Sequence, residues 1–169
     1  MLSMIETVVQ LTDGRVTGSE IQHVLDHGKR LLDFPIEVLP HVPEVLQEVK
    51  ARGLPLMLLT KGDLFDQESK LARSGLGDLF DHVEIVSEKN EATYRRLLAR
   101  YGLQPEEFVM VGNSLKSDVL PVARLGAHAV YVPYHTTWVM ERVSEQDLAE
   151  ARFHEVQNLR EVLDWLPSR

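Results

Sequence analysis

The chain has 169 residues, 26 acidic against 18 basic side chains and a formal net charge of −8. A hydrophobic fraction of 44% is typical of a globular domain, and the basic residues are scattered among acids, which argues against nucleic acid or an anionic membrane as a partner. The absence of cysteine excludes disulfides, thiolate metal ligands and a thiol nucleophile. No apolar run approaches the ~18 residues of a membrane helix. These properties predict a cytoplasmic protein.

Residues 1–35 show a helical pattern and contain no predicted strand. Ile5, Val8 and Val9 recur at helical spacing, and the polar segment 12–15 interrupts the pattern. Ser19 is the predicted cap of a second helix that extends to residue 32. This part of the chain is therefore predicted to be a hairpin of two helices.

The pattern changes after Pro35 to short apolar runs that alternate with amphipathic helices. After a helix at 42–50, the predicted strands are 55–59, 83–86, 108–111, 129–132 and, weakly, 153–156. The predicted helices between and after them are 64–74, 90–101, 116–125 and 159–165. Short apolar runs indicate strands buried on both faces, as in a parallel sheet. Residues 36–169 are thus expected to form a Rossmann-like α/β domain, a parallel sheet sandwiched by helices.

Polar residues follow the first two predicted strands, where ligands bind in such folds. Thr60, Lys61 and Gly62 offer a hydroxyl, an ammonium group and exposed backbone amides before a helix, which suits a phosphate. The alternative is an ordinary turn with Thr60 as a cap. Lys89 lies at the head of the next helix, where a cation is unfavourable, so it hints at an anionic ligand. The alternative is an exposed lysine on a capped turn.

The third predicted strand ends in Gly112-Asn113-Ser114-Leu115-Lys116-Ser117-Asp118. Asn113 offers an amide oxygen and Asp118 a carboxylate five residues later, and both are oxygen ligands suited to Mg²⁺. Asp118 is alternatively the N-cap of the following helix. The three sets of polar residues follow three strands at the same edge of one sheet, a combination that chance seldom produces.

The order of these motifs resembles motifs two, three and four of the haloacid dehalogenase (HAD) superfamily, over about residues 36–135. The resemblance implies that Thr60, with Lys61, Gly62 and Ser114, binds the phosphoryl group. It implies that Lys89 is the catalytic lysine, which neutralises phosphate and nucleophile, and that Asn113 and Asp118 hold Mg²⁺. Residues 1–35 resemble part of the helical cap that many members carry.

Two features depart from the family pattern. Asn113 replaces the usual acidic residue, which removes one negative charge from the magnesium site. Family members also begin with a strand ending in Asp-x-Asp, which supplies the nucleophile and the general acid/base; no Asp-x-Asp occurs in this chain. That strand would lie between the predicted strands 55–59 and 108–111.

The missing strand leaves three explanations open. The favoured one is that the sequence starts at an internal Met of a longer protein. Alternatively, other residues fill the gap, either Met4–Leu11 or a second chain in a homo-oligomer, or the chain is a remnant that folds differently. The expected family role is Mg²⁺-dependent hydrolysis of a small phosphorylated metabolite, and this chain is expected to be catalytically silent. Dehalogenation and an inactive phosphate-binding or dimerising module are the alternatives.

Overall fold

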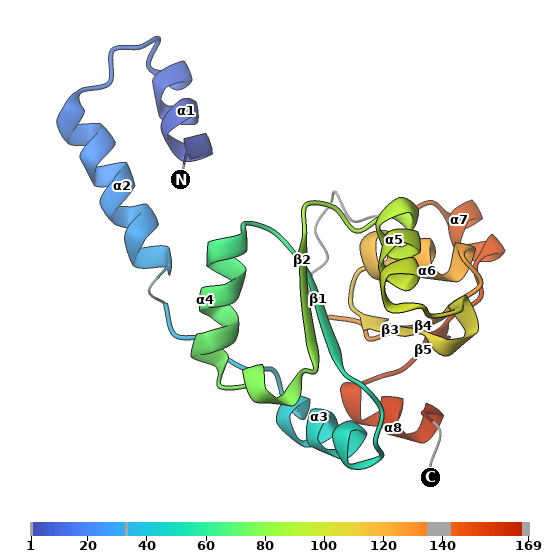
Figure 1. Cartoon of the computed structure of the whole chain (residues 1–169). Helices are drawn as coiled ribbons and strands as arrows, with labels where there is room; N and C mark the ends of the chain where they lie inside the picture. The colour runs from blue at the N-terminus through green and yellow to red at the C-terminus, as the bar shows by residue number, and fades with distance from the viewer. Residues whose placement is uncertain (1, 33, 135–142, 167–169) are drawn as a thin grey trace. The chain divides into compact units, whose positions relative to one another are not determined.

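The computed structural model describes residues 2–32, 34–134 and 143–166 (Figure 1). The chain divides into two compact units, Met1–Glu37 and Val38–Arg169. The sequence pattern places the boundary at residue 35.

The first unit is a pair of helices, α1 (Leu2–Leu11) and α2 (Gly18–Leu32). The predicted cap of the second helix, Ser19, is wrong, because Thr17 occupies that position. The Thr17 backbone N–H donates to Glu20 Oε2 at 2.8 Å, and the Glu20 N–H donates to Thr17 Oγ1 at 3.3 Å. This reciprocal arrangement is a capping box, which satisfies two amides at once. Its signal, Thr followed by Glu three residues later, is present in the sequence.

The described residues of the second unit form five strands, all paired in parallel. They are β1 (Met57–Lys61), β2 (His82–Val86), β3 (Val109–Gly112), β4 (His128–Tyr131) and β5 (His154–Glu155). Each lies within two residues of its predicted position, and the weakly predicted fifth strand has only two residues. The predicted α/β class with parallel strands flanked by helices is confirmed.

The strands form two sheets, with the orders β1-β2 and β3-β4-β5. The Leu56 carbonyl and the Gly62 amide both bond to the β2 segment, so the backbone groups of Leu59 point to the opposite edge of β1. By the same alternation, the backbone N–H and C=O of Val111 point to the edge of β3 that faces away from β4. Within the described residues no strand pairs with either of these edges. The interpretation in which Met4–Leu11 fills this gap is wrong, because that segment lies in α1.

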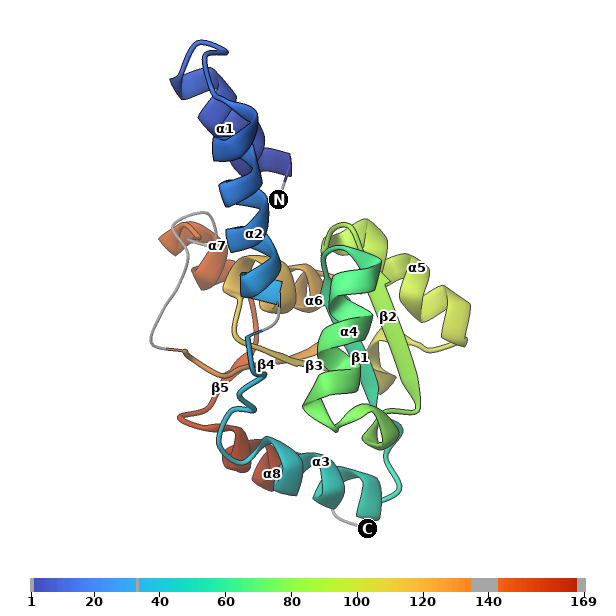
Figure 2. The same cartoon turned by 90° about the vertical axis from the view of Figure 1, so that its left-hand side faces the viewer.

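Helices cover the strands of the second unit. They are α3 (Val42–Ala51), α4 (Leu64–Ser74), α5 (Glu91–Tyr101), α6 (Leu120–Arg124), α7 (Glu145–Glu150) and α8 (Val162–Trp165). Figure 1 shows α4 and α5 on opposite sides of the β1–β2 ribbon, and Figure 2 shows α3 beside α8, which it contacts. None of the helices in the described part of the chain has the length and apolar character of a transmembrane segment.

The single helix predicted at 116–125 is instead two elements. Leu115–Val119 forms a π-helical turn, and α6 begins at Leu120. Pro121 lies just after the junction, and proline has no N–H to donate to a carbonyl four residues earlier. The backbone hydrogen-bond pattern therefore changes within the segment that the apolar spacing predicts as one helix.

The main core cluster joins the two sheets through side chains. It contains Leu59 from β1 and Met110 from β3, together with Tyr94, Leu97, Val119, Val122, Ala127 and Ala129. A smaller cluster of Val130, Val156 and Val162 packs on the other side of β4. Apolar packing thus links the two sheets where backbone pairing does not.

Replacing Leu97 with alanine is expected to lower the free energy of unfolding by about 2–5 kcal/mol, because a cavity forms in the main cluster. Leu97 is buried, whereas the side chain of Leu64 is 58% exposed. Leu64→Ala is the control and is expected to change stability by less than about 0.5 kcal/mol. Urea denaturation followed by fluorescence measures both. Equal effects of the two substitutions would contradict the core assigned here.

Candidate functional site

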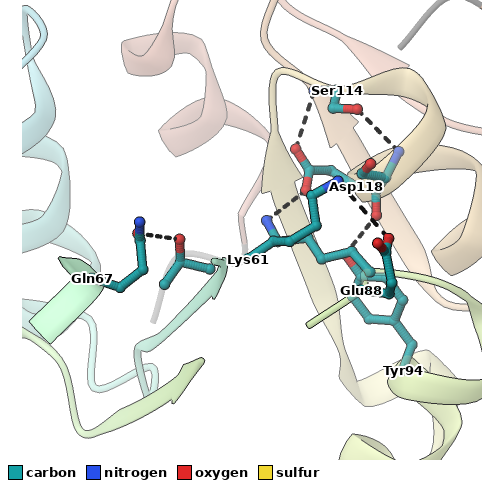
Figure 3. Close-up of polar contacts among 9 residues, drawn as sticks. Lys61, Gln67, Glu88, Tyr94, Ser114 and Asp118 are labelled. Atoms are coloured by element: carbon teal, nitrogen blue, oxygen red, sulfur yellow. Dashed lines mark hydrogen bonds and ion pairs between the residues drawn. The ribbon is translucent and has the colours of Figure 1, made fainter. Parts of the chain in front are cut away.

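The candidate site lies where β1, β2 and β3 end. The parallel register pairs Lys61 with Val86, so the carboxyl ends of β1 and β2 lie side by side. Lys89 follows β2 by three residues, and Asp118 lies in the π-helical turn after β3. The Lys89 and Asp118 side chains meet at the ends of β2 and β3 (Figure 3), although these strands belong to two sheets and not to the one sheet that the sequence predicts.

The central contact is an ion pair between Lys89 and Asp118. Lys89 Nζ donates to Asp118 Oδ1 at 2.8 Å, and the two side chains are 13% and 7% exposed. The interpretation of Lys89 as an exposed lysine is therefore wrong. The sequence predicts an anionic ligand for Lys89, and in this structure the carboxylate of Asp118 occupies that position. Water is largely excluded from the pair, so each charge depends on the other for compensation.

The second oxygen of Asp118 is also bound. The Ser114 backbone N–H donates to Asp118 Oδ2 at 3.1 Å, and Ser114 Oγ accepts from the Ser117 N–H at 3.0 Å. Ser114, not Asp118, is the N-cap of this turn, so the capping interpretation of Asp118 is wrong. The carboxylate instead points back to the end of β3.

Gly112 makes this approach possible. A Cβ atom at Gly112 would lie 2.3 Å from Asp118 Oδ2. No side chain fits there, so the glycine that ends β3 is needed for Asp118 to reach Lys89.

The first motif is organised by a residue that sequence reasoning missed. Thr60 Oγ1 donates to Gln67 Oε1 at 2.8 Å, and Gly62 adopts a φ of +149° beneath the same side chain. Asp63 caps α4 by accepting from the Asp66 N–H at 3.1 Å, so the interpretation of Thr60 as the cap is wrong. Gln67 is an ordinary helix residue in the sequence, and only the turn at Gly62 brings it to Thr60.

A cavity of about 590 Å³ opens beside the ion pair. Its basic lining residues are Lys61, Lys89, Lys116 and Arg124, and its acidic ones are Glu88 and Glu91. Lys61 Nζ lies 3.9 Å from Glu88 Oε2. Of the predicted phosphate ligands, Lys61 and Lys89 line this cavity, while Thr60, Gly62 and Ser114 are not among its lining residues.

The predicted metal ligands are one exposed amide and one buried carboxylate, from Asn113 and Asp118. Both are hard oxygen donors, Asn113 directly after β3 and Asp118 in the turn that follows, and Mg²⁺ commonly takes one or two protein carboxylates together with water and phosphate oxygens. The part of the chain that the structure describes contains no cluster of three His, Cys, Asp or Glu residues that could hold a metal. These two residues therefore suit part of a magnesium coordination shell.

Comparison with known proteins places these motifs in a recognised family. The model of the haloacid dehalogenase-like hydrolases matches residues 9–126. The chain is 42% identical to a haloacid dehalogenase-like family hydrolase of known structure from Xanthomonas campestris, with a TM-score of 0.79, over 94% of this chain and 62% of that one.

Curated relatives include two named phosphatases. A glyceraldehyde 3-phosphate phosphatase of Methanothermobacter thermautotrophicus is 30% identical over 130 residues, which is 73% of this chain and 58% of the relative. A phosphoserine phosphatase of Thermus thermophilus is 35% identical over 98 residues, which is 55% of this chain and 39% of the relative. The chain thus spans between two-fifths and three-fifths of the length of these relatives.

Gly112→Ala is expected to lower the free energy of unfolding by about 1–3 kcal/mol, because the new methyl group displaces the Asp118 carboxylate from its buried pair. Gly77→Ala is a matched control, since its Cβ would meet only Leu71 Cγ at 4.0 Å. Thermal and urea denaturation measure the difference. A Gly112→Ala protein as stable as the control would show that the approach of Asp118 to β3 is not required.

Proposed function

Because the chain belongs to the haloacid dehalogenase-like hydrolases, we propose that its site binds the phosphate group of a small phosphorylated metabolite, as part of phosphate-ester hydrolysis. The observation that carries the proposal is the shielded Lys89–Asp118 pair beside a cavity at the strand ends. The named relatives, both phosphatases, support the same substrate class.

Lys89 is the proposed phosphate ligand and catalytic lysine. Its ammonium group has three N–H donors, and Asp118 takes one of them. The remaining donors face a site that also contains Lys61. A phosphate dianion placed there would gain charge-assisted hydrogen bonds, which are stronger than neutral ones. Asp118 orients the lysine before the ligand arrives.

Thr60, Gly62 and Ser114 have supporting roles in this proposal. The Thr60 hydroxyl is held by Gln67 at the end of β1, and phosphate binding there requires the hydroxyl to turn from Gln67 to a phosphoryl oxygen. Gly62 contributes backbone to the same turn; the Gln67 side chain covers it in this structure, so a ligand would reach this backbone only when Gln67 turns away. The Ser114 side chain caps the turn that carries Asp118.

Asn113 and Asp118 are the proposed magnesium ligands. A bound Mg²⁺ would neutralise charge on the phosphoryl oxygens. Asn113 contributes an uncharged oxygen, so the protein supplies one negative charge fewer than two carboxylates would. A Lys89 that pairs with Asp118 also competes with the cation for the same carboxylate.

We propose further that the described residues bind phosphate without turning it over. An attacking carboxylate must be held in line with the leaving group. Asp118 is held by Lys89 and by the Ser114 amide, which leaves it as a partner of the lysine and not as a nucleophile. The lysines that line the cavity favour a phosphate group with two negative charges over a haloacid substrate, whose carboxylate carries one.

Lys89→Met is expected to weaken the binding of inorganic phosphate at least about tenfold, because it removes the shielded cation and leaves Asp118 to repel the anion. Isothermal titration calorimetry measures the affinity. Lys70→Met is the control, since Lys70 is an exposed lysine on α4 that pairs with Asp66.

Loss of the lysine alone can destabilise the fold, because it leaves a buried charge unpaired. The double substitution Lys89→Met/Asp118→Asn removes both charges and is the second variant. Unchanged phosphate affinity in a folded variant that lacks Lys89 would overturn the assignment of this site.

The purified chain of 169 residues is expected to show no phosphatase turnover with p-nitrophenyl phosphate, with or without Mg²⁺, although it binds phosphate. The physical reason is that the carboxylates near Lys89 are held in ion pairs: Asp118 with Lys89 itself, Glu88 with Lys61 and Glu91 with Arg124. Turnover that Lys89→Ala abolishes would contradict the expected silence and support a complete active site. Turnover that survives Lys89→Ala would contradict both the expected silence and the assignment of the site to Lys89.

A further inference from the structure

Tyr94 of α5 lies behind the turn that carries Asp118, and no pattern in the sequence marks it as part of the site. Its side chain is completely buried, and its Oη donates to the Ser117 carbonyl oxygen at 3.0 Å. Ser117 directly precedes Asp118 in the π-helical turn. Figure 3 shows Tyr94 and Ser114 on opposite sides of the turn that carries Asp118.

Pro121 explains why this carbonyl benefits from a side-chain donor. In a regular α-helix the carbonyl of Ser117 accepts from the backbone N–H of residue 121, and proline has none. Ser117 is only 8% exposed, so little water reaches this residue. An unsatisfied buried carbonyl is costly. The Tyr94 hydroxyl donates where the proline cannot.

The turn that results is wider than an α-helical turn. The Val119 N–H donates to the Ser114 carbonyl at 3.1 Å, and the Leu120 N–H donates to the Leu115 carbonyl, both across five residues. Single π-helical turns of this kind are frequent at functional sites. This turn directs the carboxylate of Asp118 back to Gly112 and Lys89.

Tyr94 is well suited to hold such a turn. Its ring lies in the main core cluster, 6.3 Å from the ring of Phe108 between centroids. Burial, with a contribution from the charge of Asp118, raises the pKa of Tyr94 far above its usual range, so the hydroxyl keeps its proton. Tyr94 also lies five residues after Lys89. One segment therefore carries both the lysine and the side chain that fixes the lysine's partner.

We propose that Tyr94 is a positioning residue, whose hydrogen bond to Ser117 replaces the amide missing at Pro121 and holds Asp118 opposite Lys89. The proposal rests on the function assigned above, in which this ion pair prepares the phosphate site. Tyr94 itself does not touch the ligand; it acts through the turn.

The first test is Tyr94→Phe, which keeps the ring and removes the hydroxyl. Hydrogen exchange at the amides of Asp118 and Val119 is expected to accelerate about tenfold, and inorganic phosphate is expected to bind about fivefold to tenfold more weakly by calorimetry. Tyr101→Phe is the matched control on the same helix, because the Tyr101 hydroxyl donates to Glu84 at 2.6 Å away from this turn. It should leave both readouts unchanged.

A double-mutant cycle separates positioning from general stability. In the Asp118→Asn background, Tyr94→Phe should no longer weaken phosphate binding, because the residue it positions is gone. Adding Pro121→Ala to Tyr94→Phe restores a backbone N–H for the Ser117 carbonyl and should recover at least part of the affinity. An equal loss in both backgrounds, or wild-type affinity in Tyr94→Phe, would overturn the role of Tyr94.

The two readouts keep the proposals apart. If the wild-type chain binds no phosphate, the proposed function fails, and the exchange rates alone still test whether Tyr94 holds the turn. If phosphate binds but the exchange of the turn is insensitive to Tyr94→Phe, the proposed function stands and the positioning role is rejected.

Discussion

The contact between Lys89 and Asp118 is the constraint to which the other features of the site conform. Two opposite charges with little access to water are tolerated only when each remains close to the other and to further hydrogen-bond donors. The missing side chain at Gly112, the amide of Ser114 and the widened turn before α6 each meet part of that requirement. A change in any of them moves the carboxylate and leaves a lysine charge without compensation.

The strands and most helices follow directly from the sequence, because short apolar runs and helical spacing are local signals. The features that escaped prediction depend on contacts between distant residues. Tyr94 and Ser117 are 23 positions apart, and nothing near Tyr94 marks it as a hydrogen-bond donor to a turn. The Gln67 side chain reaches Thr60 only because the turn after β1 brings the start of α4 back to the end of the strand. Neither contact has a periodicity that a sequence pattern can reveal.

Two of the differences between the predicted and the observed helices have a signal in the sequence. Pro121 predicts an interruption of the backbone hydrogen bonds, whereas the apolar spacing around it favours one continuous helix, and the structure contains the interruption. Thr17 and Glu20 form a recognisable capping pair, which identifies the start of α2 better than Ser19 does. Among the site residues, the strand-end positions of Lys89 and Asp118 were predictable, whereas their direct pairing was not.

The division of the strands into two sheets has a consequence for how the chain behaves in concentrated solution. An open edge of backbone donors and acceptors is a template for any extended segment that meets it. Natural sheets usually place such edges at the periphery and shorten or charge them, as in the two-residue β5. In the described part of the chain, β1 and β3 carry such edges instead, and their side chains are largely shielded. An extended segment of another copy can pair with either edge, so self-association through backbone pairing is expected to increase with concentration.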